Sequence, residues 1–372
     1  MRVQVVDPSA YTPPYDAALC SELARLGLDV ELITSAFPYG EVSVGEGYAV
    51  AEHFYRHARG APASRRRRAQ KLLEHGPDML RYRRLARRAD LVHFQWLPVP
   101  WLDRRLLPDR PIVLTAHDLL PREPRPGQAR AQRSLYDAVR AVVVHSAHGR
   151  TQLVERLGVP GDKVRVIHHG AFEHLVRTPV APLPPELPDP AGPVVLFFGL
   201  LRPYKGIDVL LEAWGRMTTP PDGQLWVVGR PRMAIDALRA AEGPGVRLVP
   251  RFVSDGEMAA CLRRADLVVL PYVETERLDF SGVLAAALAF AKPLVLSDVG
   301  GFSEVAAEGA ARLVPPRDPG ALAAALSDLL ADAEARRELA AAAAAAAAGP
   351  YSWKESASRT FDLYRDLIHG QL

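Results

Sequence analysis

The stretch FFGLLRPYKG, Phe197–Gly206, decides the expected fold of the second half of the chain. It opens as an apolar run typical of a buried strand and stops at Gly199, and Arg202 and Lys205 follow. An arginine and a lysine placed where a buried strand ends are well suited to bind a diphosphate. Two solvated loop cations are the alternative explanation of the same pattern.

Strands and helices alternate on the C-terminal side of this stretch. An amphipathic helix is expected from Ile207 to Met217, and Ser254 with Glu257 forms a capping box that begins another helix. Short apolar runs predict strands at Val194–Phe198, Gln224–Val228, Leu267–Leu270 and Leu294–Ser297. Strands that alternate with helices in this way predict a doubly wound parallel sheet.

The first half of the chain shows the same alternation. A helix is expected from Tyr15 to Leu26, between two apolar runs. The predicted strands are Val3–Asp7, Asp29–Thr34, Leu91–Phe94, Ile112–Thr115 and Ala141–His145. The expected fold class is therefore α/β, with two doubly wound Rossmann-like domains.

A proline-rich segment separates the two halves. Residues 176–193 carry seven prolines, which exclude both a helix and a central strand. We expect this segment to be a linker between an N-terminal domain at 1–175 and a C-terminal domain at 194–350. The aromatic spacing of residues 351–372 predicts a final helix, and we expect it to pack back on the N-terminal domain.

Composition excludes several classes of protein. The net charge of +3 gives no bulk attraction to nucleic acid, and the sequence shows no nucleic-acid recognition module. Cys20 and Cys261 lie far apart in sequence, so a disulfide framework is not expected and a reducing cytoplasm suits the chain. No apolar run is long enough to span a bilayer. The expected location is the cytoplasm, either free or peripheral at the inner face of the membrane.

The expected ligand site lies at the ends of the strands. Doubly wound sheets bind ligands beyond the carboxyl ends of their strands, so two facing domains predict a site in the cleft between them. Arg202 and Lys205 fall at such a strand end. Gly282 begins a predicted helix and leaves backbone N–H groups accessible, which favours an anion.

Taken together, these motifs resemble the retaining, nucleotide-sugar-dependent glycosyltransferases of family 4, which have the GT-B fold. The segment FFGLLRPYKGIDVLLEAW is similar to that family's strand, R-x-x-K-G loop and helix. Four further segments match the family in order and spacing: WVVGRP, RADLVVLPY, AKPLVLSDVGGFSEV and, in the first half, IVLTAHD. The resemblance covers nearly the whole chain and is strongest over residues 194–305.

The resemblance assigns roles to individual residues. It implies that Arg202 and Lys205 hold the donor diphosphate, that the N–H groups of Gly282 and Val283 cap it, and that His117 faces the transferred sugar. Residues 251–253 would border the base, and Glu304 would support a neighbouring glycine loop. The implied donor-binding set is Gly199, Arg202, Lys205, Gly229, Arg251, Val253, Ser281, Gly282, Val283 and Glu304.

The chain departs from the family at one pair of positions. The family commonly carries two glutamates eight positions apart, and Leu278 and Ala286 stand there in this sequence. The nearest carboxylates are Asp279 and Glu276, and we expect Asp279 to take over the contact with donor-sugar hydroxyls as a catalytic residue. The ribose contact of the second glutamate has no replacement, so the identity of the donor stays open.

The implied reaction is a metal-independent hexosyl transfer with retention and without a cofactor. The leaving diphosphate itself accepts the proton of the acceptor hydroxyl, so catalysis is positioning plus stabilisation of the leaving group. Two alternatives remain open. A catalytically lapsed GT-B binding or scaffold protein is favoured by the missing glutamates, whereas a sugar-nucleotide epimerase needs acid and base residues that the sequence does not identify.

The acceptor is expected against the N-terminal domain. The loop after its first strand carries Tyr11, Tyr15 and Asp16, whose rings could stack on a sugar or pack on their own helix. Arginine clusters at Arg65–Arg68 and Arg81–Arg88 suit an anionic membrane surface and thus a lipid-linked acceptor, although a solvated basic face explains them as well. A glycan, a lipid-linked and a small-molecule acceptor all remain open, and the expected role is glycan or glycolipid biosynthesis.

Overall fold

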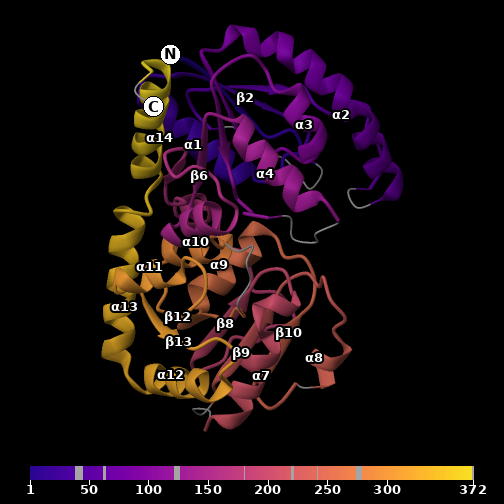
Figure 1. The fold of residues 1–372 in the computed structure, drawn as a ribbon. Coiled ribbons are helices and arrows are strands. Elements are labelled where there is room, and N and C mark those ends of the chain that lie inside the picture. The colour runs from indigo at the N-terminus through magenta and orange to yellow at the C-terminus, as the bar shows by residue number, and fades with distance from the viewer. Residues whose placement is uncertain are drawn as a thin grey trace. The chain divides into compact units, whose positions relative to one another are not determined.

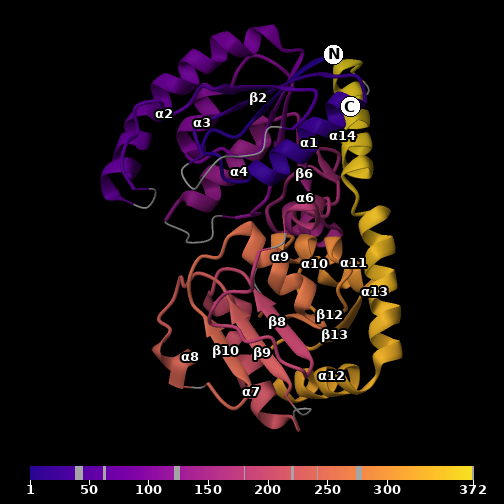
Figure 2. The same ribbon diagram turned by 180° about the vertical axis from the view of Figure 1, so that it is seen from behind.

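The computed structural model describes residues 1–37, 45–61, 64–120, 126–179, 181–218, 222–240, 242–273 and 279–370. Its contacts divide the chain into two compact units, each with its own sheet and helices (Figures 1 and 2). Unit 1 comprises Met1–His169, Glu276–Asp279 and Trp353–Leu372, and unit 2 comprises Gly170–Thr275 and Phe280–Ser352.

Unit 1 is built on a parallel sheet of seven strands in the order β3-β2-β1-β4-β5-β6-β7. Its strands β4, β5 and β6 are buried along their whole length, which explains why their sequences are apolar apart from His93 and Thr115. The strands are β1 Arg2–Val6, β2 Asp29–Thr34, β3 Ala49–Glu52, β4 Leu91–Phe94, β5 Ile112–Thr115, β6 Ala141–Val144 and β7 Val164–Val166.

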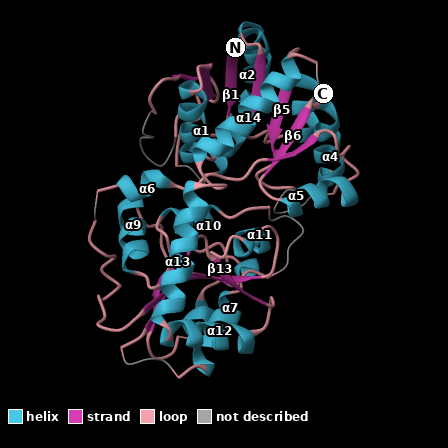
Figure 3. Cartoon of the chain, turned by 90° about the vertical axis from the view of Figure 1, so that its left-hand side faces the viewer, coloured by secondary structure: helices cyan, strands magenta, loops and turns pink. Residues whose placement is uncertain are grey.

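Helices link and cover the strands of unit 1. Two prolines in the first turn of α1 set its start, and Ser64 caps α2 by accepting a hydrogen bond from Arg67 N. The final helix α14 packs against α1 (Figure 3). The helices of unit 1 are α1 Pro13–Arg25, α2 Arg65–Leu85, α3 Pro100–Leu106, α4 Gln128–Ala138, α5 Ala147–Thr151 and α14 Trp353–Ile368, with short turns η1 Ala86–Arg88 and η2 Gln152–Arg156.

Unit 2 repeats the doubly wound arrangement with six parallel strands in the order β10-β9-β8-β11-β12-β13. If the strands are numbered within the unit, the order is 3-2-1-4-5-6, which is that of the Rossmann fold. The strand order changes direction between the neighbouring strands β8 and β11. The strands are β8 Val194–Phe198, β9 Gln224–Val228, β10 Val246–Val249, β11 Leu267–Leu270, β12 Leu294–Ser297 and β13 Ala311–Val314.

The helices of unit 2 follow from local sequence signals. The predicted capping box of Ser254 and Glu257 is confirmed at the start of α9, and the amphipathic helix α7 buries Leu210 and Trp214. The helices are α6 Glu173–Arg177, α7 Ile207–Arg216, α8 Asp236–Ala240, α9 Asp255–Arg264, α10 Gly282–Ala289, α11 Phe302–Ala307, α12 Pro319–Ala331 and α13 Ala333–Ala348, with the turn η3 Pro203–Lys205.

The fold class predicted from the sequence is confirmed. Every predicted strand is present within one residue of its expected bounds, whereas strands β3, β7, β10 and β13 had no prediction. Edge strands β3 and β13 are partly exposed and lack the continuous apolar run by which the others are recognised. Cys20 and Cys261 are buried free thiols.

The proline-rich segment belongs by its contacts to unit 2, which begins at Gly170. Arg263 donates to the carbonyls of Val176 and Thr178. Arg264 donates to the carbonyls of Pro190 and Gly192 at 2.6 and 2.8 Å. These two arginines of α9 therefore attach both ends of the expected linker to the unit.

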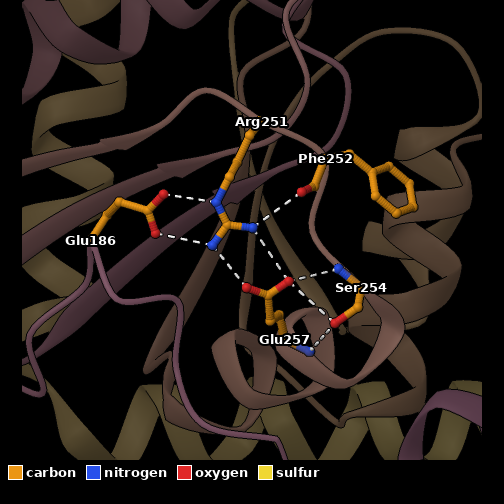
Figure 4. A network of polar contacts seen from close by, with 5 residues as sticks. All are labelled: Glu186, Arg251, Phe252, Ser254 and Glu257. Atoms are coloured by element: carbon orange, nitrogen blue, oxygen red, sulfur yellow. Dashed lines mark hydrogen bonds and ion pairs between the residues drawn. The ribbon is translucent and has the colours of Figure 1, made fainter.

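A third arginine attaches the middle of the segment (Figure 4). The Arg251 guanidinium pairs with Glu186 through two hydrogen bonds of 2.7 and 3.0 Å, and with Glu257 of the capping box at 2.8 Å. Both carboxylates raise the pKa of Arg251, and Arg251 in turn lowers the pKa of Glu186 and Glu257. The network links the proline-rich segment to the start of α9.

We predict that Arg264→Ala releases the proline-rich segment locally. The change removes two charge-assisted hydrogen bonds to carbonyls, each contributing about 1.5–3 kcal/mol. A glutamyl endopeptidase should then cleave after Glu186 at least tenfold faster than in the unaltered protein. Arg239→Ala, which changes an exposed arginine of α8, is the matched control. Equal cleavage rates in all three proteins would contradict the attachment.

Candidate functional site

The donor-side residues gather where the winding of unit 2 reverses. Gly199 follows β8, and Pro271 and Tyr272 follow the neighbouring strand β11. Ligands of doubly wound sheets bind beyond the strand ends at this point. Lys205, on the turn η3 after β8, is buried and donates a hydrogen bond of 2.6 Å to the Tyr272 hydroxyl.

Two glycines make room at these strand ends. Gly229 follows β9 at φ 149°, and a Cβ on it would lie 1.9 Å from the Gly199 carbonyl oxygen. No side chain fits in that space, so the two backbones pack directly on each other. A Cβ on Gly199 would lie 2.9 Å from both Lys205 Nζ and the Val283 side chain. Gly199 therefore brings the lysine and the start of α10 close together.

The start of α10 offers donors to an anion. Ser281 is the N-cap residue but makes no side-chain capping hydrogen bond; its hydroxyl lies 3.1 Å from the Tyr272 hydroxyl instead. The first N–H groups of a helix have no intrahelical partner, and here they belong to Gly282 and Val283. A Cβ on Gly282 would contact the Phe172 ring at 3.4 Å.

Arg202 supplies the second cation of the R-x-x-K-G loop. It precedes η3, is half-buried, and its Nε atom is buried without a hydrogen-bond partner among the described residues. A buried guanidinium nitrogen without a partner costs free energy, and a bound anion would remove that cost. Within unit 2 the structure thus brings together six predicted donor-binding residues: Gly199, Lys205, Gly229, Ser281, Gly282 and Val283.

Three other predicted donor-binding residues lie elsewhere in unit 2. The Arg251 guanidinium is engaged by Glu186 and Glu257, and Val253 is buried, while Phe252 between them is 63% exposed. Glu304 lies in the first turn of α11. Burial raises the pKa of the Tyr351 hydroxyl, and the negative charge of Glu304 raises it further. Roles for these residues in donor binding stay predictions.

In unit 1 a buried acid pair organises the loop after β1. The Asp7 carboxylate accepts hydrogen bonds from the N–H groups of Ser9, Tyr11 and Thr12 at 3.2, 2.6 and 3.1 Å. Asp16 of α1 is equally buried, and burial raises the pKa of both acids, with the Asp7 charge raising that of Asp16 further. Three donors favour the charged form of Asp7, so the proton of the pair resides on Asp16.

Aromatic rings extend from this loop to the predicted His117. Tyr11 is 60% exposed and lies edge-on to Trp96, with ring centroids 5.3 Å apart. Trp96 donates to Thr12 Oγ1 at 3.0 Å and stacks on His117 at 5.0 Å. Tyr15, by contrast, is buried against the rings of four residues: His117, His145, His169 and Trp353. Of the two predicted tyrosines, Tyr11 is the exposed one.

His117 lies in a histidine network. Its Nδ1 is 3.3 Å from His145 Nε2, and its Nε2 is 3.0 Å from Gln95 Oε1. Burial lowers the pKa of His145 to about 4, so its ring is neutral near pH 7, and its Nδ1 donates to the Ile167 carbonyl. His145 Nε2 is therefore an acceptor and His117 Nδ1 a donor. This network fixes the orientation of the His117 ring.

Asp279 belongs by its contacts to unit 1. Its carboxylate accepts hydrogen bonds from the backbone N–H of His145 and from the Ser146 hydroxyl, and a Cβ on Gly149 would collide with it. These contacts hold the carboxyl end of β6 and the start of α5. Leu278 and Ala286 stand at the positions of the family's two glutamates. Ala286 is buried in α10, whereas Leu278 and the neighbouring Glu276 lie outside the described residues. A contact of Asp279 with a donor sugar stays a prediction.

Four residues of these sites were missed at the sequence level: Asp7, Trp96, His145 and Tyr272. Each directly follows a predicted strand or comes within two residues of its end. Polar residues at the carboxyl ends of neighbouring strands were the signal that could have found them. Among the described residues, no group of three or more His, Cys, Asp or Glu side chains could hold a metal ion.

The described part of the chain contains no helix that is long and apolar enough to cross a bilayer.

The two arginine clusters lie on α2 and on the turn η1 that follows it. Helix α2 also carries three exposed leucines, Leu72, Leu73 and Leu80, whose relative exposure is 50–77%. The two carboxylates of α2 are turned inward: Asp78 is buried and Glu74 half-buried.

Two Rossmann-like units, each with a parallel sheet wound in this order, are the architecture of the GT-B fold. The family model described as glycosyl transferases group 1 matches residues 192–332, and that of glycosyltransferase family 4 matches residues 17–171. The chain belongs to glycosyltransferase family 4.

Individual relatives agree with this assignment. The chain is 30% identical to a D-inositol 3-phosphate glycosyltransferase of Corynebacterium aurimucosum, over 75% of this chain and 72% of that protein. It is 38% identical to a phosphatidyl-myo-inositol mannosyltransferase of Mycobacterium leprae, over 47% of each chain.

Solved structures show the same fold. Sucrose-phosphate synthase from Thermosynechococcus elongatus matches all of both chains with a TM-score of 0.75 at 20% identity. HepE from Anabaena, solved in complex with UDP, matches 98% of this chain and 100% of its own with a TM-score of 0.71 at 17% identity.

We predict that acidification destabilises the protein through His145. The ring is neutral when folded, with a pKa of about 4, whereas an unfolded histidine has a pKa near 6.5. Its contribution is therefore complete above pH 6.5 and is lost as the pH falls toward 4, by about 1.4 kcal/mol for each pH unit. In the variant His145→Asn, the side-chain amide N–H can still donate to the Ile167 carbonyl, but no group at this position titrates.

Denaturant unfolding of both proteins from pH 7 to 4.5 measures this effect. The free-energy difference between the original protein and the variant should shrink as the pH falls. The buried acids Asp7 and Asp16 titrate in the opposite sense, because their raised pKa values favour the folded state at low pH, but both proteins carry them. A difference that stays constant would contradict a neutral buried His145.

Proposed function

We propose that this glycosyltransferase moves a hexosyl group from a nucleoside diphosphate sugar to an acceptor hydroxyl. The observation that carries the proposal is the cluster at the β8 and β11 strand ends, where Lys205 and the start of α10 converge around Gly199. Arg202 precedes the same turn η3, and its buried Nε has no hydrogen-bond partner among the described residues. Cations and helix N–H groups together suit a diphosphate. HepE, which shares the fold, was crystallised with UDP, and this supports a nucleotide donor.

The proposed reaction is transfer with retention and without a metal. The bond between the anomeric carbon and the diphosphate oxygen breaks as the acceptor oxygen bonds to that carbon on the same face. The departing diphosphate oxygen takes the acceptor proton, so no protein base is required. Charge grows on the diphosphate in the transition state, and Arg202 and Lys205 then stabilise it more strongly than in the bound donor.

The acceptor is proposed to bind against unit 1, beside the exposed Tyr11 and the Trp96 stacked on His117. The acid pair of Asp7 and Asp16 holds this loop in place before substrate arrives. The names of the two relatives point to inositol phosphate and phosphatidylinositol as acceptors of those proteins. Both compounds are therefore the first acceptors to test here.

A lipid-linked acceptor is supported by the outer face of α2. Four residues of α2 are spaced so that they lie on one side of the helix, because intervals of seven and four residues are close to whole turns. They are Arg66, Leu73, Leu80 and Arg84. All four are exposed. A leucine stripe with arginines and inward-turned carboxylates fits the surface of an anionic membrane.

A binding or scaffold protein without transfer activity is the second candidate function. The residue that favours it is Ala286, which stands buried in α10 at the position of a family glutamate. An epimerase of the same fold would change the stereochemistry of the donor sugar without an acceptor. Analysis of the sugar product therefore separates all three functions.

We predict that one nucleoside diphosphate stabilises the protein against heat. UDP, GDP, ADP and dTDP are tested by thermal melting at up to millimolar concentration, with Lys205→Ala for comparison. A ligand at 100 times its dissociation constant adds about 2.7 kcal/mol to the free energy of unfolding. The Lys205→Ala variant should fold and show no shift. If no nucleotide shifts the melting curve of the original protein, the donor assignment fails.

We predict that α2 binds anionic vesicles. Each arginine near such a surface contributes about 1 kcal/mol, so Arg66→Ala with Arg84→Ala should weaken binding to phosphatidylglycerol vesicles about 30-fold at 0.1 M salt. The matched control removes two exposed arginines outside α2, Arg239 and Arg312. Vesicle sedimentation measures the binding. Equal binding of both double variants, or no binding by the original protein, would rule out α2 as the membrane surface.

A further inference from the structure

Tyr272 lies at the centre of the donor-side cluster, and its ring is fixed from several sides. It is 1% exposed and packs between Tyr204 and Phe302, with ring centroids 5.7 and 5.2 Å away. The backbone N–H of Val273 donates to the Tyr204 carbonyl at 2.8 Å, which joins this strand end to the turn that carries Lys205. The phenol hydroxyl therefore has a defined position.

The hydroxyl accepts a hydrogen bond from Lys205. The two atoms are 2.6 Å apart, and an ammonium group can only donate, so Tyr272 is the acceptor. A phenol is uncharged at neutral pH, so this hydrogen bond orients the ammonium group and brings no negative charge of its own.

The same hydroxyl reaches the start of α10. Its oxygen lies 3.1 Å from Ser281 Oγ, and Ser281 does not cap the helix with its side chain. Since Tyr272 accepts from Lys205, its own proton can be donated to Ser281 Oγ. Ser281 then has its hydroxyl proton to offer in another direction. The N–H groups of Gly282 and Val283 begin the helix directly beside it.

We propose that Tyr272 is a positioning residue for the donor diphosphate. It holds Lys205 Nζ and directs the Ser281 hydroxyl, so that both meet the diphosphate as donors beside Gly199. The inference rests on the proposed function, since it assigns a role within that diphosphate site. It predicts that Tyr272 and Ser281 act on nucleotide binding as one coupled unit.

Tyr272→Phe tests this inference because it keeps the ring and removes only the hydroxyl. The dissociation constants of the best-binding nucleoside diphosphate and of inorganic pyrophosphate are measured by calorimetry. We expect both to rise about tenfold. Ser281→Ala should have a similar effect, and the double variant should be no weaker than the weaker single variant, because the two changes remove the same interaction.

Tyr204→Phe is the matched control. It removes a hydroxyl from the neighbouring ring of the same aromatic cluster and should leave both dissociation constants unchanged. Melting temperatures show whether each variant is folded. A purely structural role of Tyr272 would lower the melting temperature without coupling to Ser281 in nucleotide binding.

Two outcomes overturn the inference. If the original protein binds nucleotide and folded Tyr272→Phe binds within twofold of it, or if the effects of the two single changes multiply in the double variant, Tyr272 does not position these donors while the proposed function stands. If the original protein binds neither any nucleoside diphosphate nor pyrophosphate, the inference and the proposed function fail together.

Discussion

The direct packing of Gly229 on the carbonyl of Gly199 is the constraint on which the strand ends of β8 and β9 depend. A Cβ on Gly229 would come within 1.9 Å of that oxygen, so β8 and β9 can end together only without a side chain. A Cβ on Gly199 would in turn lie 2.9 Å from both Lys205 Nζ and the Val283 side chain of α10. Residues from three segments of unit 2 meet there because the sheet places β8 next to both β9 and β11.

In unit 1 the loops after the strands are held by buried polar groups instead of by glycine packing. The ends of β1 and β4 carry Asp7, Gln95 and Trp96, and Asp7 fixes the following loop through three backbone N–H groups. Burying such groups is costly unless they are hydrogen-bonded. Asp7 is bonded to the loop and Trp96 to Thr12, whereas the buried Gln95 Nε2 has no partner among the described residues. A loop held in this way has little conformational freedom, and it carries the exposed Tyr11.

Arg251 and Lys205 are two basic groups of unit 2 that differ in their described hydrogen-bond partners. Arg251 is paired with Glu186 and Glu257, and this network attaches the proline-rich segment to α9. The Lys205 ammonium donates a hydrogen bond to the Tyr272 phenol. The sequence predicts donor binding both for the R-x-x-K-G loop and for residue 251. The structure places Arg251 in an ion-pair network with two carboxylates, whereas Lys205 of the loop lies beside the start of α10.

The sequence by itself determined the alternation of strands and helices in both halves, the capping box of α9 and the cations after β8. Strands buried on both faces must be continuously apolar, and helix caps are set by residues three apart, so local patterns suffice for these features. Only the tertiary structure decided which groups meet. Lys205 and Tyr272 are 67 residues apart, and Asp279 and His145 are 134 apart. Contacts of this kind depend on the order of strands in the sheet, which no local pattern encodes.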